Sequence, residues 1–139
     1  MINQTCNGII NALRKAFPLS KVPVIYTEKV PYGFQRPSFL LELLPWCSMD
    51  LTACIREYPI SWQVVYFPPR DDAGNEDVEN LHDVAIRMDE VFGQAVALPL
   101  PDGSLAHITD FSWEELNGVG YATIALSVVF LRMIDDPAP

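Results

Sequence analysis

Residues Ile55–Phe67 read IREYPISWQVVYF, and apolar residues recur there at every second position. In an extended chain this spacing puts Ile60, Trp62, Val64 and Tyr66 on one face. The segment is also rich in β-branched and aromatic residues, which favour strands. It therefore predicts a β-strand with one face turned toward a hydrophobic core.

Further strands are predicted on both sides of this segment from their β-branched and aromatic residues, bounded by Pro, Gly and Asn. They are Val22–Thr27, Ser38–Leu44, Leu105–Phe111 and Val119–Ile134. The last two are joined through Asn117-Gly118, a dipeptide typical of two-residue hairpin turns.

Two segments repeat apolar residues at three- and four-residue spacing, which predicts amphipathic helices. They are Asn3–Phe17 and Glu76–Phe92. Asn75 is the predicted N-cap of the second helix, and the acidic residues of its first turn suit the positive end of the helix dipole.

The order of elements is helix, three strands, helix and two strands. Sequential strands with short turns favour an antiparallel or mixed sheet. We therefore predict a single α+β domain over residues 1–139, with one antiparallel or mixed sheet of about five strands and two helices packed on one face. About half of the residues are hydrophobic, enough for a compact core, and residues 135–139 are predicted to be a frayed tail.

The net charge is −9, which opposes binding to the DNA backbone but suits a channel through which DNA passes without adhering. The charge is unevenly distributed: residues 1–36 carry +4 and residues 71–90 carry −7. These segments are either two solvated faces or complementary patches that meet between neighbouring subunits.

No catalytic, metal-binding or cofactor-binding motif is found, so we expect neither an enzyme nor a bound cofactor. The three cysteines lack CxxC spacing and the two histidines form no HxH or HxxxH pair. The adjacent acid pairs fall in predicted loops or the tail, where carboxylates are usually solvated. Neither a signal peptide nor a membrane-spanning segment is predicted.

A surplus of apolar surface remains. Two helices of about four turns cover roughly one face of a five-stranded sheet, yet the strands Ser38–Leu44 and Val119–Ile134 are largely apolar on both faces. Either a neighbouring subunit or the chain's own loops must cover the other face. The loop Lys29–Pro37, with Val30, Tyr32 and Phe34, is unusually apolar for a loop.

The layout resembles a family of small phage tail terminator proteins. The similarity covers nearly the whole chain and rests on the order of elements together with these segments: IINALRKAFP, VIYTEKVPYGFQRPSFLLEL, ISWQVVYFPP, EDVENLHDVAIRMDEVF, PDGSLAHITDF and YATIALSVVFLRM. The resemblance implies a structural virion protein, assembled in the cytoplasm of a bacterial host. It would form a ring, commonly a hexamer, on the last ring of the tail tube, stop tube polymerisation and offer a docking surface to the head.

The partners implied are other copies of the chain, the tail-tube protein and the head–tail connector or neck proteins, with genomic DNA passing through the lumen. The residues expected to contact a neighbouring subunit or the tube are Val30, Tyr32, Phe34, Gln35 and Arg36. Asp71 and Asp72 are expected to face the lumen. Two alternatives stay open: a head–tail adaptor of the neck, and a small hydrolase or ligand-binding domain.

Overall fold

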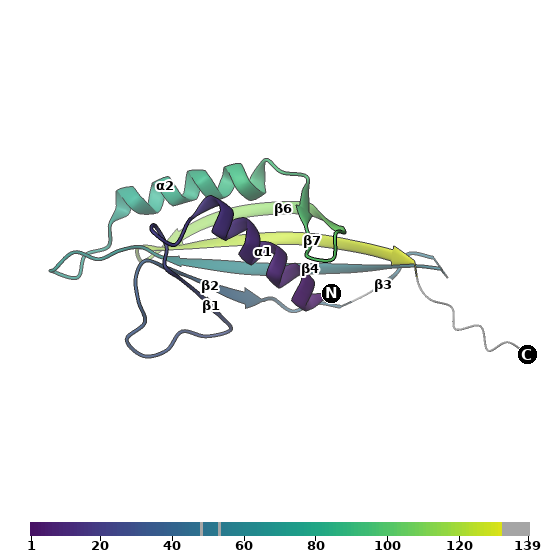
Figure 1. Ribbon diagram of the computed structural model, residues 1–139, viewed down its shortest axis with the longest axis horizontal. Coiled ribbons are helices and arrows are strands. Elements are labelled where there is room, and N and C mark those ends of the chain that lie inside the picture. Colours follow the sequence, from purple (N-terminus) through teal and green to yellow (C-terminus); the bar gives the residue numbers. More distant parts are fainter. Residues whose placement is uncertain (48, 53, 132–139) are drawn as a thin grey trace, which may run out of the picture.

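The computed structural model describes residues 1–47, 49–52 and 54–131 (Figure 1). The helical elements are α1 (Ile2–Ala16), α2 (Val78–Met88) and the π-helical turn η1 (Asp89–Gly93). The strands are β1 (Val24–Thr27), β2 (Ser38–Leu43), β3 (Met49–Asp50), β4 (Ile55–Phe67), β5 (Ala97–Pro99), β6 (Leu105–Leu116) and β7 (Val119–Leu131). The predicted frayed tail, residues 135–139, lies outside the described residues.

The strands form one seven-stranded sheet in the order β1-β2-β4-β7-β6-β5, and β3 pairs with β4. β1 and β2 run parallel and the other pairs run antiparallel, so the sheet is mixed. The α+β class is confirmed, but the predicted count of about five strands is wrong. The two extra strands, β3 and β5, are two and three residues long. Segments this short show no periodicity and exist only through pairing with a neighbour.

β6 also extends to Leu116, five residues beyond the predicted end at Phe111. Its pairing with β7 shifts register between Ile108 and Asp110, which marks a β-bulge. The extra residue moves Phe111 and Trp113 onto the face that carries Ile108. The period-two pattern is broken at this point, and this hid the second half of the strand.

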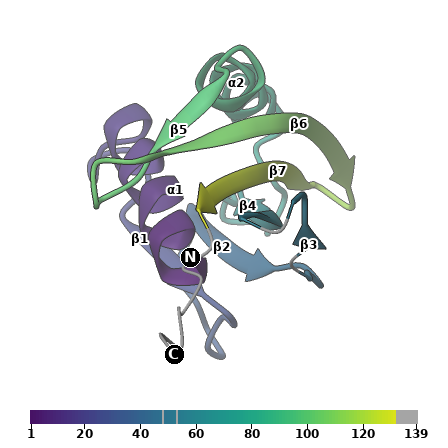
Figure 2. The same cartoon turned by 90° about the vertical axis from the view of Figure 1, so that its right-hand side faces the viewer.

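Both helices pack on the same face of the sheet, which curls around them (Figures 1 and 2). The β4 residues that were predicted to share a core-facing side are buried, as are Ile9 and Leu13 of α1 and Leu81 of α2. Long side chains of β4 also bond to each helix. The Trp62 indole N–H donates to Thr5 Oγ1 over 3.0 Å, and the Tyr66 hydroxyl donates to Asn80 Oδ1 over 2.6 Å.

α2 is capped by Asp77, not by the predicted Asn75. The Asp77 carboxylate accepts a hydrogen bond of 3.0 Å from the Asn80 backbone N–H, as an N-cap side chain should. Asn75 is used in the preceding loop, where its backbone N–H donates to the Asp71 carboxylate. The helix thus begins two residues later than predicted, because Asp77 accepts the capping hydrogen bond while Asn75 belongs to the preceding loop.

The Asn117-Gly118 turn between β6 and β7 is confirmed. Both residues have positive φ, 54° and 76°. A two-residue turn of this kind needs positive φ at both central positions, and Asn and Gly tolerate it best. The turn joins β6 and β7, which pair antiparallel.

Candidate assembly surfaces

The loop between β1 and β2, residues 28–37, is here called the aromatic loop. The Phe34 ring lies 4.6 Å from that of Phe67 at the end of β4 and 6.4 Å from that of Tyr26 in β1, measured between centroids. The Arg36 guanidinium lies 5.1 Å from the Phe34 centroid and 5.4 Å from the Phe67 centroid. These distances are within the range of cation–π attraction. The base of the loop is therefore packed on the face of the sheet opposite the two helices, which we call the helix-free face.

Polar contacts fix the same segment. The Gln35 backbone N–H donates to the Tyr26 hydroxyl oxygen over 3.1 Å, and Arg36 Nη1 donates to the Pro68 carbonyl over 3.4 Å. Burial, and then the nearby Arg70 charge, lower the pKa of Arg36 from its ordinary value. A partly desolvated guanidinium held by two rings and a carbonyl serves as a structural anchor.

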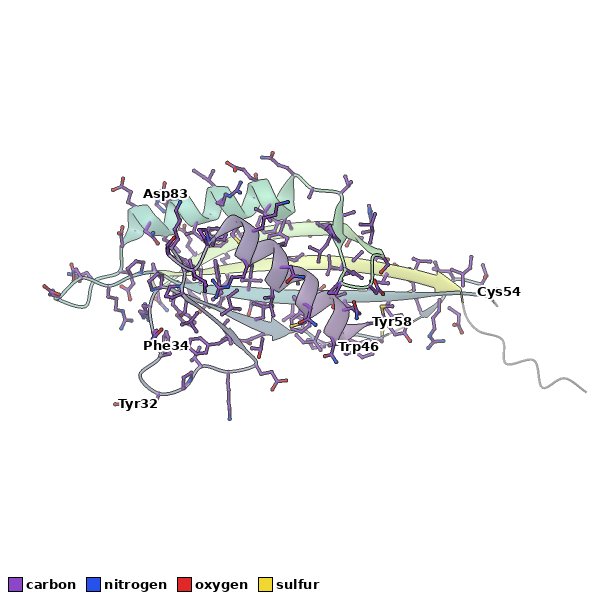
Figure 3. The ribbon with its side chains drawn as sticks, viewed as in Figure 1. Tyr32, Phe34, Trp46, Cys54, Tyr58 and Asp83 are labelled. Atoms are coloured by element: carbon purple, nitrogen blue, oxygen red, sulfur yellow. The ribbon has the colours of Figure 1, made fainter. Side chains whose placement is uncertain are left out.

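The five residues of the predicted contact set are thus placed differently. Phe34 and Arg36 are committed to contacts within the chain, and Val30 is half-buried. Tyr32 is fully exposed, at 107% of its reference area, and projects from the tip of the loop (Figure 3). Gln35 is also exposed. Contact with a partner remains a prediction for all five, and the geometry favours Tyr32.

The helix-free face of the sheet is not uniformly apolar. At its β1–β2 edge the aromatic loop covers Phe67. The chain's own loop, one of the two alternatives left open by the sequence, therefore covers part of this face. In the middle, neighbouring strands present the half-buried polar residues Ser61, Gln63 and Thr123. The need for a neighbour is therefore smaller at this edge than the strand composition indicates.

Several exposed apolar residues lie at the opposite end of the sheet, where β3, β4 and β7 extend beyond the helices (Figure 1). Met49 and Val129 both pair with Glu57, so the three side chains share the helix-free face. Met49 is 46% exposed and Val129 is 54% exposed. On the other face, the Trp46 ring is 41% exposed and lies 5.8 Å from the Tyr58 ring. We call this region the apolar end.

Sequence reasoning missed the apolar end. Residues 45–54 show no helical or alternating pattern, so Met49 was not placed on any element. The available signal was the density of large apolar residues in a segment with no predicted structure. Its position beside Val129, eighty residues later, depends on the pairing of β3 with β4 and of β4 with β7.

The loop that holds the two predicted lumen-facing acids protrudes between β4 and α2. The Asp71 Oδ1 atom accepts hydrogen bonds of 2.9 Å from the backbone N–H groups of Ala73 and Asn75. The Asn75 bond is the largest cause of the lowered pKa of Asp71. Asp71 therefore organises the loop, and Asp72 is exposed beside it. Whether either acid faces a lumen stays a prediction.

We expect Asp71→Ala to disorder this loop and Asp72→Ala to leave it intact, because only the first removes an acceptor from the turn. Amide hydrogen exchange at Ala73 and Asn75 measures the difference. Exchange should accelerate in the Asp71 variant alone. Equal protection in both variants would contradict the assigned role of the carboxylate.

One charged residue of the basic segment 1–36 and two charged residues of the acidic segment 71–90 border the same groove. Lys21, Asp83 and Arg87 line one groove between the end of α1 and α2. Arg14 donates to the backbone carbonyls of Val22 and Pro23. Arg14 is therefore engaged within the chain. Contact between the basic and acidic segments of neighbouring copies stays a prediction.

The side chains that could take part in catalysis or metal binding are dispersed over the fold. His82 is exposed and lies 3.2 Å from the Glu115 carboxylate, a contact that links α2 to β6. Burial, followed by the charge of Glu28, raises the pKa of the Cys6 thiol. Among residues 1–47, 49–52 and 54–131, no group of three or more His, Cys, Asp or Glu side chains could hold a metal ion. Over the same residues, the helices are too short or too polar to cross a membrane.

These features describe a domain with an exposed aromatic residue at one end of its sheet and exposed apolar residues at the other. A family model described as phage tail terminator protein matches residues 5–138. The chain belongs to the phage tail terminator family. The match covers almost the whole domain, including most of α1, all of α2 and the full sheet. No curated protein matches the chain. Family membership makes this terminator a structural component of a phage tail, and so of the virion.

Proposed function

We propose that this terminator forms a ring, a hexamer by the resemblance, on the last ring of the tail tube. The ring stops tube polymerisation and offers a different surface to the connector or neck proteins of the head. Occupancy is sufficient for this role, since covering the growing face of the tube needs no chemical step. A closed ring requires a heterologous contact, in which one surface meets a different surface of the next copy.

The observation that carries the proposal is the anchored aromatic loop. Phe34 and Arg36 hold the base of the loop against Phe67, and Tyr32 stands fully exposed at the tip. An exposed aromatic residue on an anchored loop is a frequent hot spot, because its ring buries a large area on binding. The apolar end supplies a second surface at the far end of the sheet.

Asp72 and the overall acidic charge fit a channel for DNA. Negative charge on the wall makes no counterion-releasing contacts with phosphates, so a passing duplex is not retained. In this proposal the β4–α2 loop, ordered by Asp71, presents Asp72 to the lumen.

Tyr32→Ser is expected to abolish normal tube termination while leaving the fold intact. The substitution removes the exposed ring, and Phe34 is left in place because its ring anchors the loop. Tails assembled with the variant should vary in length or lack heads by electron microscopy, and the melting temperature should stay within about 2 °C of the parent, as for a surface change.

Tyr32→Phe is the matched control, since it keeps the ring and loses only the hydroxyl. It should support tails of normal length. Normal tails with Tyr32→Ser would remove Tyr32 from the contact.

The adaptor alternative is tested by position. A cryo-electron micrograph of the neck should place this chain directly on the last tube ring. Density for the chain only on the head side of that layer would identify an adaptor instead.

A further inference from the structure

An open groove of about 490 Å³ lies between α1, the end of α2 and the segment Ala97–Pro101. It is distinct from the aromatic loop and the apolar end. Its floor includes the apolar side chains of Leu98 and Leu100, and Lys15 and Arg87 stand along it. This volume lies in the range of sites that bind small ligands or short peptide segments.

The groove exists because α1 presents small residues to β5. A Cβ on Gly8 would lie 3.0 Å from both Leu100 Cδ2 and the Pro99 carbonyl oxygen, so the helix lies close to the strand there. One turn later Ala12 lines the groove with a single methyl group. The space beside it is bordered by apolar atoms and is open to an added chain.

We propose that this groove binds the carboxyl-terminal segment of a neighbouring copy, residues 132–139. That segment reads RMIDDPAP. Met133 and Ile134 match the apolar floor, and Asp135 and Asp136 match the positive charge of Lys15. Arg87 also borders the groove, where its guanidinium lies 3.0 Å from the Glu90 carboxylate. The inference rests on the proposed ring, because it names one pair of surfaces through which adjacent subunits join.

Strand direction favours a neighbour as the donor. β7 runs to Leu131 at the end of the sheet that extends beyond the helices (Figure 1). The groove is instead lined by α1, the end of α2 and residues 97–101. A return to its own groove needs a sharp reversal directly after Leu131. The next residues, Arg-Met-Ile, lack the Gly, Pro, Asn or Asp that favours such a turn. Eight residues span about 27 Å when extended, which is enough to cross to an adjacent subunit.

Such an exchange gives a heterologous contact. Each subunit donates one carboxyl-terminal segment and accepts another, and this arrangement closes into a ring when the rotation allows it. The groove and the segment need not be close in the isolated subunit for this to work.

The first test is direct binding. A fluorescent peptide of residues 131–139 is titrated into a chain that ends at Leu131, and anisotropy is recorded. We expect saturable binding that weakens at least tenfold when Lys15→Glu is introduced, or when Met133 and Ile134 of the peptide are replaced by serine. Restored binding of a peptide with Asp135→Lys and Asp136→Lys to the Lys15→Glu chain would confirm the charge match. Absence of saturable binding, or indifference to these changes, overturns the site.

The second test separates a neighbour from self-occupancy. A tagged chain ending at Leu131 offers a groove without a segment, and a full-length Ala12→Trp chain offers a segment with a filled groove. The two should associate when mixed and neither should self-associate, as judged by light scattering. Circular dichroism checks that Ala12→Trp folds, and Lys15→Glu replaces it otherwise. Failure of the mixed pair to associate overturns exchange between copies.

The outcomes also separate this inference from the proposed function. Rings that form normally from the chain ending at Leu131 would refute the segment–groove contact and leave the terminator role in place. A full-length chain that neither forms rings nor caps tubes would refute the terminator role itself.

Discussion

Phe39→Ala should lower the free energy of unfolding by about 3–5 kcal/mol, the usual cost of removing a large buried aromatic side chain. Phe39 has no exposed surface, and its ring lies 5.2 Å from that of Phe17 and 5.1 Å from that of Tyr66. It therefore joins β2 to the end of α1 and to β4 at once. The loss is a large share of the roughly 5–15 kcal/mol that stabilises a typical domain. Urea denaturation monitored by tryptophan fluorescence measures it.

Leu43→Ala is the matched control, because Leu43 lies on the same strand and the same face but is 36% exposed. It should cost less than about 1.5 kcal/mol, since little buried area and no closed cavity are involved. Equal losses of unfolding free energy for the two variants would contradict the conclusion that Phe39, and not Leu43, is part of the buried core.

Thr5→Val is expected to destabilise the protein by about 1–3 kcal/mol, although the two side chains have nearly the same shape. The Thr5 hydroxyl accepts the Trp62 indole N–H and donates to the Ile2 carbonyl over 2.9 Å. Both Thr5 and Trp62 are buried, so valine leaves the indole N–H without an acceptor. The cost arises from desolvation of that donor, and it is measured by the same denaturation assay.

Trp62→Phe removes the donor, and the double variant tests the pair. If the hydrogen bond couples α1 to β4, the double variant should be more stable than the sum of the two single losses predicts. Strict additivity would mean that the two side chains act independently. In variants that lack Trp62, unfolding is followed by circular dichroism and by the fluorescence of Trp46 and Trp113.

The main elements followed from local pattern. The alternation at Ile60, Trp62, Val64 and Tyr66 predicted a strand whose bounds, Ile55–Phe67, agree with β4. The helix predicted at Asn3–Phe17 agrees with α1 to within one residue at each end. These segments are long enough to repeat their period several times, and burial of a regular face reinforces the same period.

The candidate contact surfaces were harder to predict. The aromatic loop was correctly singled out by its composition, but composition does not distinguish the exposed Tyr32 from the packed Phe34. That distinction depends on Phe67, more than thirty residues later, and on the Arg36 side chain, which lies over both rings. In the same way, the acid pair Asp71-Asp72 divides into one residue that orders a turn and one that is exposed.

Local periodicity and turn chemistry were sufficient for the α+β class, the two helices and the hairpin at Asn117-Gly118, because these depend on residues that are close in the chain. The family resemblance also came from the sequence. The short strands β3 and β5, the apolar end and the groove beside α1 required the folded chain. Each arises from contacts between distant segments, whose energies depend on which faces meet, and no local pattern encodes that choice.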